Sequence, residues 1–379
     1  MKLHEFNWRR FCAVVCKEFI QMRRDRMTFG MMIGIPMVQL ILFGYAINSD
    51  PKHLPTAVYS ADNSVFSRTI VEAMHNSSYF DITREPKNEA EINTLLAENK
   101  VQFAVSIPVD FSRKLLRGER PDLLLEADAT DPTAVGYAIA AMNALMPTVL
   151  NRDLTGPLAK LQAGGAPFNL IVQQHYNPEN ITQYNIVPGL MGVMLTMTMV
   201  MITALAITRE RERGTMENLL ATPVRPGEVL IGKIIPYIMI GYVQVTLILL
   251  AAKFLFDVPM VGSLPLLVVM TFLFIVANLA VGITFSTIAK NQLQAVQMAF
   301  FFFLPSLLLS GYMFPFRGMP GWAQDIGECL PLTHFLRVVR GILLKGNGVS
   351  EIAPDLWPIA LFLLVMLVIG IKRYRQTLD

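Results

Sequence analysis

Charged residues are scarce in this chain. Asp, Glu, Lys and Arg together make up 16% of its 379 residues, whereas soluble proteins average roughly a quarter. Hydrophobic residues make up 53% and are gathered in long blocks. The formal net charge is only +3 and the basic residues form no stripe, so we expect no nucleic-acid partner. The composition therefore favours an integral membrane protein.

Cysteine and histidine are too few and too scattered to build a metal site or a disulfide framework. The three cysteines are Cys12, Cys16 and Cys329, and the five histidines stand singly along the chain. Neither set has the spacing of a zinc site or of a paired-cysteine scaffold. We therefore expect no bound metal.

Six stretches lack Asp, Glu, Lys and Arg for long enough to suggest membrane spans. A helix needs about 20 apolar residues to cross a hydrocarbon core of about 30 Å. The stretches are 27–49, 180–208, 234–252, 264–289, 291–316 and 356–371. The last has only 16 residues, and Trp357, Lys372 and Arg373 could extend it to both interfaces. The sequence thus predicts a polytopic α-helical membrane protein with six transmembrane helices.

The distribution of basic residues predicts the orientation. Sixteen Lys or Arg lie in the segments before span one, between spans two and three, between spans four and five, and after span six. Only five lie in the short loops of the opposite side. Because basic loops stay in the cytoplasm, both termini are expected there. The long segment after span one is then extracytoplasmic.

That long segment, 49–185, reads as an inserted α/β or α+β domain. Apolar strand patterns at 56–59, 79–83, 101–107, 123–127 and 170–176 alternate with helix patterns. The expected helices lie around 66–74 and 89–98, after Pro108, and from 134 toward 161. Asp62 and Asp131 have the chemistry of helix caps. No catalytic grouping is present among these residues.

The spans also lack deep ionisable residues. A charge at the bilayer centre is costly and marks proton or ion pathways, so its absence disfavours an ion-coupled carrier. It also removes the carboxylate, Ser–His and zinc groupings that an intramembrane hydrolase would need. We therefore expect no catalytic residues in this chain.

One segment has the spacing of a phosphate-binding loop. Gly227 and Gly232–Lys233 match it, but Ile234 stands where the motif needs the hydroxyl of Ser or Thr, and no strand precedes the segment. No nucleotide or other cofactor is therefore expected to bind this chain directly.

Two cytoplasmic segments have a docking character. Residues 5–24 carry aromatic and aliphatic side chains on one helical face and basic side chains on the other, which is typical of an interfacial helix. The alternative is a simple positively charged anchor. The segment 209–224 mixes both signs of charge and then presents Leu219 and Leu220, and exposed leucines favour a partner-binding loop.

The chain resembles the permease subunit of bacterial type-2 ATP-binding-cassette (ABC) exporters, specifically multidrug-efflux permeases with a large periplasmic domain. The resemblance covers nearly the whole chain. Its most specific part is 209–224, which is similar to the family's coupling segment. It implies ATPase-coupling roles for seven residues. These are Glu210, Glu212, Gly214, Thr215, Glu217, Leu219 and Leu220.

Two further segments are similar to the family. One group of residues resembles the family's fifth span and short outer-leaflet helices. It consists of Pro305–Ser306, Leu309–Gly311, Pro315, Met319–Pro320, Trp322, Pro331–Thr333, Arg337 and Arg340–Gly341. Lys17–Glu18 and Arg24–Asp25 resemble its connecting helix. The resemblance implies the type-2 permease fold in a bacterial inner membrane. In this fold, 1–26 would be a cytoplasmic connecting helix, 27–48 span one, and 49–185 the periplasmic domain. Spans two to six would lie within 186–371, which would also contain a coupling loop at 208–228 and outer-leaflet helices at 318–345. Residues 372–379 would form a cytoplasmic tail.

The resemblance also implies partners. The cytoplasmic segments are too short for an ATPase domain, so ATP and magnesium would act through a separate ABC ATPase subunit. A second permease chain would complete a homodimer or heterodimer within the membrane lipids. A periplasmic adaptor and an outer-membrane channel would complete the export route.

The function implied is outward movement of hydrophobic or amphiphilic compounds, either drug-like molecules or lipids. An apolar path could be lined by Asn278, Phe300, Phe303, Met194 and Met197, although such residues are also ordinary packing in membrane helices. Two alternatives remain. A receptor or scaffold would act through the external domain, and an ion-coupled carrier would show repeated polar breaks.

Overall fold

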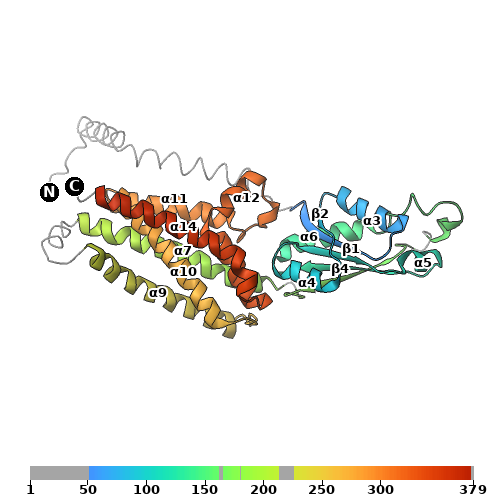
Figure 1. The fold of residues 1–379 in the computed structure, drawn as a ribbon, viewed down its shortest axis with the longest axis horizontal. Helices are drawn as coiled ribbons and strands as arrows, with labels where there is room; N and C mark the ends of the chain where they lie inside the picture. Colours follow the sequence, from blue (N-terminus) through green and yellow to red (C-terminus); the bar gives the residue numbers. More distant parts are fainter. Residues whose placement is uncertain (1–50, 162–164, 180, 213–225, 377–379) are drawn as a thin grey trace, which may run out of the picture.

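The computed structural model describes residues 51–161, 165–179, 181–212 and 226–376. An α/β domain and a group of long helices follow one another along the longest axis of the molecule (Figure 1). The segments expected as the connecting helix and span one, 1–26 and 27–48, lie outside the described residues. So do most of the expected coupling loop, 213–225, and the last three residues.

Five strands form one mixed sheet in the α/β domain. They are β1 (Leu54–Ser60), β2 (Phe80–Arg84), β3 (Phe103–Ile107), β4 (Asp122–Asp128) and β5 (Asn169–His175), in the spatial order β2-β1-β3-β4-β5. β1 is parallel to β2 and β3, β4 is antiparallel to β3, and β5 is parallel to β4. The α/β character expected from the alternating patterns is confirmed.

Helices cover both faces of this sheet. One core holds side chains of α3 (Val65–Asn76), α5 (Phe111–Leu116) and α6 (Pro132–Leu145). A smaller cluster holds α4 (Glu89–Ala97) against Ala57 and Ala104. Neighbouring strand residues point to opposite faces, so Ala104 faces α4 while Val105 belongs to the larger core. α4 therefore lies on the face opposite to α3, α5 and α6.

The helix expected from 134 toward 161 is too long. α6 ends at Leu145 and Pro147 follows its C-cap, where the missing N–H prevents another helical turn. The chain then turns back, and Leu150 and Leu154 enter the core before the short helix η2 (Gly156–Leu161). The apolar residues after Leu145 lack strict helical periodicity, and counting them as helix placed the predicted end of this helix too late.

Five long helices form the other part of the molecule. They are α7 (Thr182–Glu212), α9 (Pro226–Phe254), α10 (Leu264–Ile288), α11 (Gln292–Leu309) and α14 (Val349–Gln376). Within the described residues, five segments are long and apolar enough to cross a membrane. They correspond to expected spans two to six. α7 begins at Thr182, ahead of the boundary expected at 186.

The expected fifth and sixth spans have different bounds in the structure. α11 ends at Leu309, because Gly311 adopts a left-handed φ of 81° that favours glycine and breaks the helix. The span expected at 291–316 is thus too long. α14 has 28 residues and begins at Val349, so the 16-residue span expected at 356–371 begins too late. The uncharged run begins only after Asp355, whose charge is paired inside the fold with His334 and Arg337.

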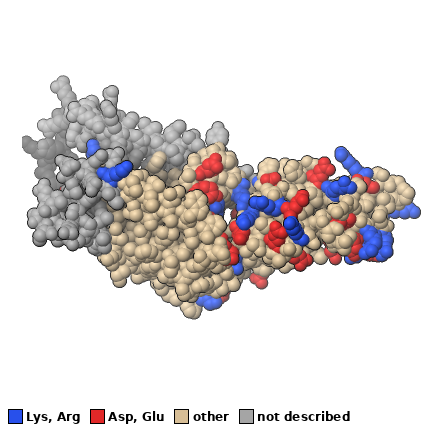
Figure 2. Space-filling view, in the orientation of Figure 1, with Lys and Arg blue, Asp and Glu red and all other residues tan. Residues whose placement is uncertain are grey.

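α10 lies at the centre of the helical part. It packs against α7, α14 and α13 (Pro331–Arg340), and the rings of Phe274 and Phe335 stack with centroids 3.9 Å apart. α9 and α14 expose most of their apolar side chains. The space-filling view accordingly shows few charged residues over the described helices and many over the α/β domain (Figure 2).

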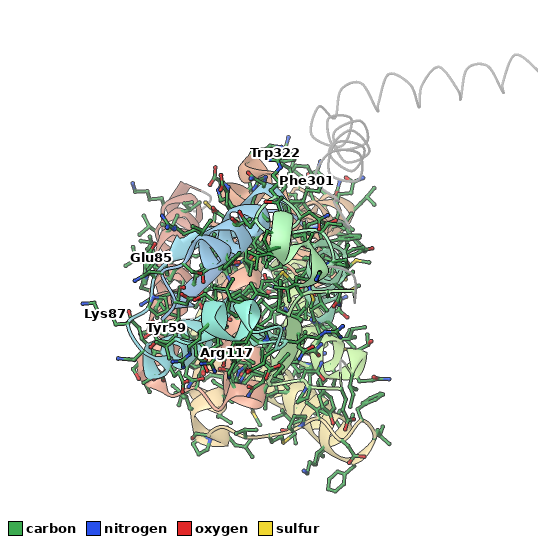
Figure 3. All side chains as sticks on the ribbon, turned by 90° about the vertical axis from the view of Figure 1, so that its right-hand side faces the viewer. Tyr59, Glu85, Lys87, Arg117, Phe301 and Trp322 are labelled. Carbon is green, nitrogen blue, oxygen red and sulfur yellow. The ribbon has the colours of Figure 1, made fainter. Side chains whose placement is uncertain are left out.

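A groove of about 700 Å³ lies on the α/β domain between α3 and the segment after β2. Tyr59, Glu85 and Lys87 belong to its lining and lie along one side of the domain in Figure 3. Its rim carries charges of both signs.

Candidate functional site at the junction of domain and helices

The segment 310–348, called here the junction segment, connects α11 to α14 and contacts the α/β domain. It contains η3 (Phe316–Gly318), α12 (Gly321–Glu328), α13 and η4 (Gly341–Lys345). α12 lies at the end of the helical part that faces the domain (Figure 1). Charged side chains of both signs gather there (Figure 2). The junction is therefore where the two parts of the molecule can influence each other.

Lys345 is the most enclosed charge of the junction. Its side chain is 1% exposed, and Nζ lies 2.5 Å from Asp128 Oδ2. It also donates to Asn99 Oδ1 at 2.6 Å and to the Leu96 carbonyl oxygen at 3.0 Å. The ammonium lies 5.0 Å from the centroid of the Tyr176 ring. A buried ammonium is retained only when it is paired and hydrogen-bonded, and here both conditions are met by the α/β domain.

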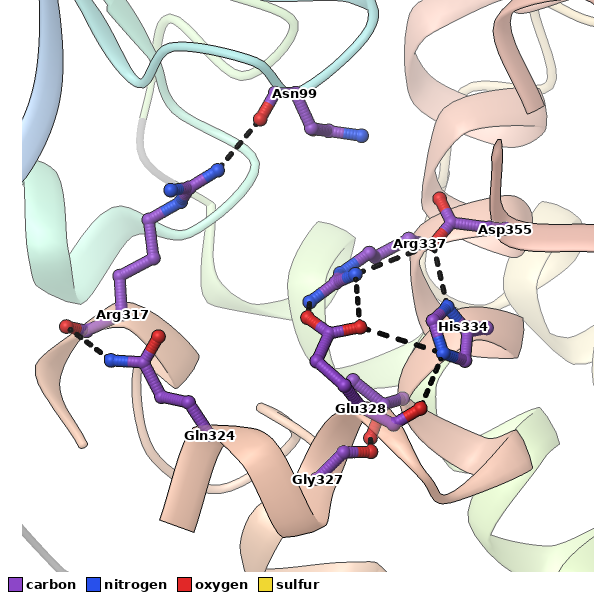
Figure 4. A network of polar contacts seen from close by, with 9 residues as sticks. Asn99, Arg317, Gln324, Gly327, Glu328, His334, Arg337 and Asp355 are labelled. Atoms are coloured by element: carbon purple, nitrogen blue, oxygen red, sulfur yellow. Dashed lines mark hydrogen bonds and ion pairs between the residues drawn. The ribbon is translucent and has the colours of Figure 1, made fainter. Parts of the chain in front are cut away.

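Two other side chains of the junction segment bind the end of α4 in the same way. Arg317 Nη2 donates to the Asn99 carbonyl oxygen at 2.7 Å, as Figure 4 shows. Asn347 Nδ2 donates to the Ala97 carbonyl oxygen at 3.0 Å. The last carbonyl groups of a helix have no partner inside it. Here the junction segment supplies those partners.

Burial raises the pKa of the Tyr176 hydroxyl to about 12, and the carboxylates of Asp128 and Glu126 add to the shift. Tyr176 therefore remains neutral at any physiological pH. Its ring supports the Lys345 ammonium through its π face.

Arg340 connects α13 with the start of α7. Its Nη2 donates to Asn185 Oδ1 at 2.7 Å, and its Nη1 to the Gly311 carbonyl oxygen at 3.3 Å. Asn185 Nδ2 in turn donates to the Thr130 carbonyl oxygen at 2.6 Å. A single chain of hydrogen bonds thus joins α13, the first turn of α7 and the α/β domain.

A second polar network fixes α12, α13 and α14 to one another (Figure 4). His334 Nδ1 lies 2.8 Å from Asp355 Oδ1, and its Nε2 lies 2.8 Å from the Glu328 carbonyl oxygen. The ring of His334 therefore links α13 to Asp355 of α14 and to the end of α12. Arg337 binds Glu328 through two bonds of 2.5 and 3.1 Å and reaches Asp355 at 3.3 Å. In the described part of the chain, no three His, Cys, Asp or Glu are arranged to hold a metal ion.

Two cavities lie beside these contacts. A polar one of about 110 Å³ is lined by Arg317, Arg337 and Arg340 together with Asp128 and Asp131. A larger one of about 300 Å³ lies between the start of α6, the start of α7 and the turn after α11. Burial raises the pKa of the Asp131 carboxyl, which lines both cavities, and the Arg340 guanidinium opposes this shift.

The other end of α7 carries the described part of the predicted coupling site. Glu212 accepts from the backbone N–H of Gln292 at 2.7 Å and from Gln292 Nε2 at 2.5 Å, which ties α7 to the first turn of α11. These hydrogen bonds lower the pKa of Glu212. Glu210 lies on α7 as well. The remaining predicted coupling residues lie outside the described residues. They are Gly214, Thr215, Glu217, Leu219 and Leu220.

The residues expected along a substrate path are dispersed. Asn278 is fully buried, and its Nδ2 donates to the Phe274 carbonyl oxygen at 2.9 Å. Met194, Met197 and Phe300 are 44%, 38% and 37% exposed on the outside of the helices. Phe303 packs against the central helical core. None of the five lines the two junction cavities or the groove of the α/β domain, so the path stays a prediction.

Sequence reasoning missed the junction as a site. Lys345 entered only the charge count, Arg337 and Arg340 entered the charge count and the family resemblance, and Asp131 was assigned only as a helix cap. The sequence signal for this site was three basic residues between two predicted spans. Lys and Arg are common in such loops, so the signal did not distinguish a site. The partners of Arg340 and Lys345, which are Asn185, Asn99 and Asp128, are more than a hundred residues away in sequence, so no local pattern identifies them.

The chain is similar to known transporter permeases over most of its length. Residues 26–372 match the family described as ABC-2 family transporter protein. The chain is 30% identical over 347 residues to the "Probable multidrug ABC transporter permease YbhS" of Escherichia coli (strain K12), covering 90% of each chain. It is 28% identical to the "Inner membrane transport permease YhhJ" of the same organism, over 90% of this chain and 93% of that protein. These similarities extend across the α/β domain, the junction and the long helices.

Proposed function

This chain belongs to the ABC-2 family of transporter proteins, and from that premise we propose that it is a permease that exports amphiphilic compounds. The resemblance seen in the sequence is confirmed, and the chain is the membrane subunit of an ABC exporter. ATP hydrolysis is assigned to a separate ATPase subunit with its own magnesium. The compounds would be drug-like molecules or lipids with an apolar body and a polar group.

The observation that carries this proposal is the path of α7. Its 31 residues correspond to about 46 Å at about 1.5 Å per residue, which exceeds a hydrocarbon core of about 30 Å. One end is bound at the junction through Asn185. The other end is tied to α11 through Glu212, which is itself one of the residues predicted to contact the ATPase. A displacement of that segment would therefore reach the junction through one continuous helix.

The orientation follows from the distribution of basic residues. With both termini in the cytoplasm of a bacterial cell, the α/β domain and the junction lie on the periplasmic side of the inner membrane. The predicted coupling segment then faces the cytoplasm, where ATP is available. The charged residues around the junction support this arrangement, because they need contact with water or with the α/β domain.

The assembly we propose contains two permease chains and two ATPase subunits. α9 and α14 have largely exposed apolar faces, which suit lipid or a second permease chain. The periplasmic α/β domain would contact an adaptor that leads to an outer-membrane channel.

Association with an ATPase tests the proposal directly. The purified chain would be reconstituted with the ATPase encoded beside its gene, and Glu217→Ala and Leu219→Ala would be compared with the natural chain. Both variants are expected to lose ATPase stimulation, because a buried leucine anchors and a charge sets the register of an interface. Glu119→Ala and Leu116→Ala remove exposed residues of the same types from the α/β domain and should leave stimulation unchanged. If no ATPase binds the natural chain, the exporter proposal fails and a receptor or scaffold takes its place.

A further inference from the structure

The smaller cavity of the junction, of about 110 Å³, has three guanidinium groups in its walls. Arg317 comes from η3, and Arg337 and Arg340 come from α13. Asn99 and Gln102 line it from the α/β domain, between α4 and β3. Since a water molecule occupies about 30 Å³ in the liquid, the cavity has room for a group of the size of a phosphate.

The two carboxylates that line this cavity are already bound elsewhere. Asp128 pairs with the Lys345 ammonium at 2.5 Å. Asp131 accepts from the Thr133 backbone N–H at 3.2 Å and so caps α6. Burial raises the pKa of Asp131, against the opposing charge of Arg340. Among the described residues, no ion pair joins either carboxylate to a guanidinium of this cavity.

Several N–H groups of the cavity walls have no partner in the described part of the chain. Arg317 carries five N–H groups, of which one donates to the Asn99 carbonyl oxygen. Arg340 Nε is enclosed from solvent and has no hydrogen-bond partner. The side-chain amides of Asn99 and Gln102 also donate to no described group. An unpartnered buried N–H group is costly, so these walls favour a ligand that accepts hydrogen bonds.

The electrostatic surroundings of Arg317 also favour an anion. Burial lowers the pKa of its guanidinium, and the charge of Arg337 lowers it further. Asp128 and Glu328 oppose this shift without cancelling it. Arg337, by contrast, is held by Glu328 and Asp355, as Figure 4 shows. Arg317 is therefore the guanidinium of this cavity that would gain most from a negative ligand.

The position of the cavity suits the headgroup level of a membrane. Arg317 lies just before α12, on which Trp322 and Ile326 are 41% and 47% exposed. Trp322 lies at the rim of the molecule in Figure 3. Tryptophan is enriched where a bilayer meets water. The cavity is therefore close to the level at which the phosphate groups of phospholipids lie.

We propose that this cavity is a phosphate-binding site, in which Arg317 and Arg340 hold the oxygen atoms of one phosphate group. A planar guanidinium binds phosphate through two parallel hydrogen bonds. A phospholipid headgroup and inorganic phosphate share this chemistry, and binding experiments separate the two sources. The site requires that the junction lies at a membrane surface, and it does not depend on the exporter function or on the compound exported.

Equilibrium binding of radiolabelled probes to the purified full-length chain in detergent tests the site without an ATPase. The three probes are inorganic phosphate, short-chain phosphatidylglycerol, and a short-chain diacylglycerol that lacks the phosphate. Arg317→Gln is expected to raise the half-saturating concentration of the phosphate-bearing probes by about tenfold, because it removes a charged donor. Arg117→Gln is the matched control, because Arg117 is exposed on the α/β domain and does not line this cavity. It should bind all three probes as the natural chain does.

A negative charge placed in the cavity gives a second, independent measurement. Gln102→Glu keeps the size of the side chain and should abolish phosphate binding, because like charges repel. Its thermal midpoint should be no lower than that of the natural chain, since a carboxylate offers an acceptor to the unpartnered N–H groups. Gln173→Glu, at an exposed position of β5 outside the cavity, should bind normally. Arg317→Lys keeps the charge without the planar fork and should bind with intermediate affinity.

The probes also identify the source of the phosphate. If Arg317→Gln and Gln102→Glu lose both phosphate-bearing probes, the site exists and free phosphate is sufficient to fill it. If the natural chain binds phosphatidylglycerol but not inorganic phosphate, and both variants lose the lipid, the site takes a lipid headgroup. Equal affinity of the natural chain and both variants, or equal binding of phosphatidylglycerol and diacylglycerol, would overturn the proposal. No outcome requires ATPase association, so failure of this site is distinguishable from failure of the exporter function.

Discussion

At the residue scale, Lys345 decides how the domain is held to the helices. Its ammonium and the Asp128 carboxylate are 1% and 7% exposed, and removing one member of a buried pair leaves an uncompensated charge that costs roughly 3–5 kcal/mol. Lys345→Met should therefore markedly lower the thermal unfolding midpoint of the purified permease. Lys114→Met breaks a pair with Asp110 whose side chains are 44% and 23% exposed and should have little effect. Equal midpoints for the two variants would contradict this account.

Asp62 gives a prediction for pH dependence. Burial, the largest single influence, raises its pKa, but hydrogen bonds from Ser112 and Ser64 together outweigh it, so the pKa lies below the ordinary value. The bond from the Ser112 backbone N–H, at 2.8 Å, joins the loop after β1 to α5. A lowered folded-state pKa contributes stability above the unfolded value near 3.8, and this stability is lost as pH falls through the folded pKa.

Asp62→Asn should therefore lower the denaturant midpoint of the α/β domain at pH 7, by an amount corresponding to about 1–3 kcal/mol. The difference from the natural chain should shrink toward pH 3. Fluorescence-detected unfolding of the full chain at several pH values measures this. A difference that is constant with pH would show that the carboxylate charge is unimportant.

At the element scale, the packing of α7 on α10 depends on Gly282. A Cβ there would lie 2.6 Å from the Val200 carbonyl oxygen, and backbone cannot move away as a flexible side chain can. Gly282→Ala should separate the two helices and lower both the yield of folded protein and its thermal midpoint.

Gly136→Ala is the matched control, because Gly136 lies inside α6 with nothing within 4 Å of an added Cβ. This change should be neutral or stabilise by about 0.4–1 kcal/mol. Size-exclusion profiles and thermal midpoints of both variants decide the question. The same result for both glycines would show that the α7–α10 contact tolerates a methyl group.

At the scale of the whole molecule, the α/β domain should be separable from ATPase binding. The domain begins with β1 at Leu54 and ends with β5 at His175, so a deletion of 54–175 with a flexible linker removes the complete sheet. Loss of pull-down by the proposed periplasmic adaptor with retained ATPase association is the expected result. Unaltered adaptor pull-down would assign the adaptor contact to the helices or the junction instead.

The five described spans and the strand–helix alternation could be predicted because each depends on local sequence. Uncharged length identifies a span, and alternation identifies a strand. The ends of elements were less predictable. Gly311 ends α11 through its backbone conformation, and Asp355 is tolerated in α14 because His334 and Arg337 pair with it. Such compensation comes from residues on other helices.

The sequence by itself determined the class of protein, the family and the likeness of 209–224 to a coupling segment. These follow from composition and from residues that are neighbours in the chain. Only the tertiary structure decided that Lys345 meets Asp128, that Arg340 meets Asn185, and that Asp131, Ile186 and Tyr312 surround one cavity. The physical reason is that a charge or an apolar wall acquires its function from the groups within a few ångströms of it, and folding brings those groups together from distant parts of the chain.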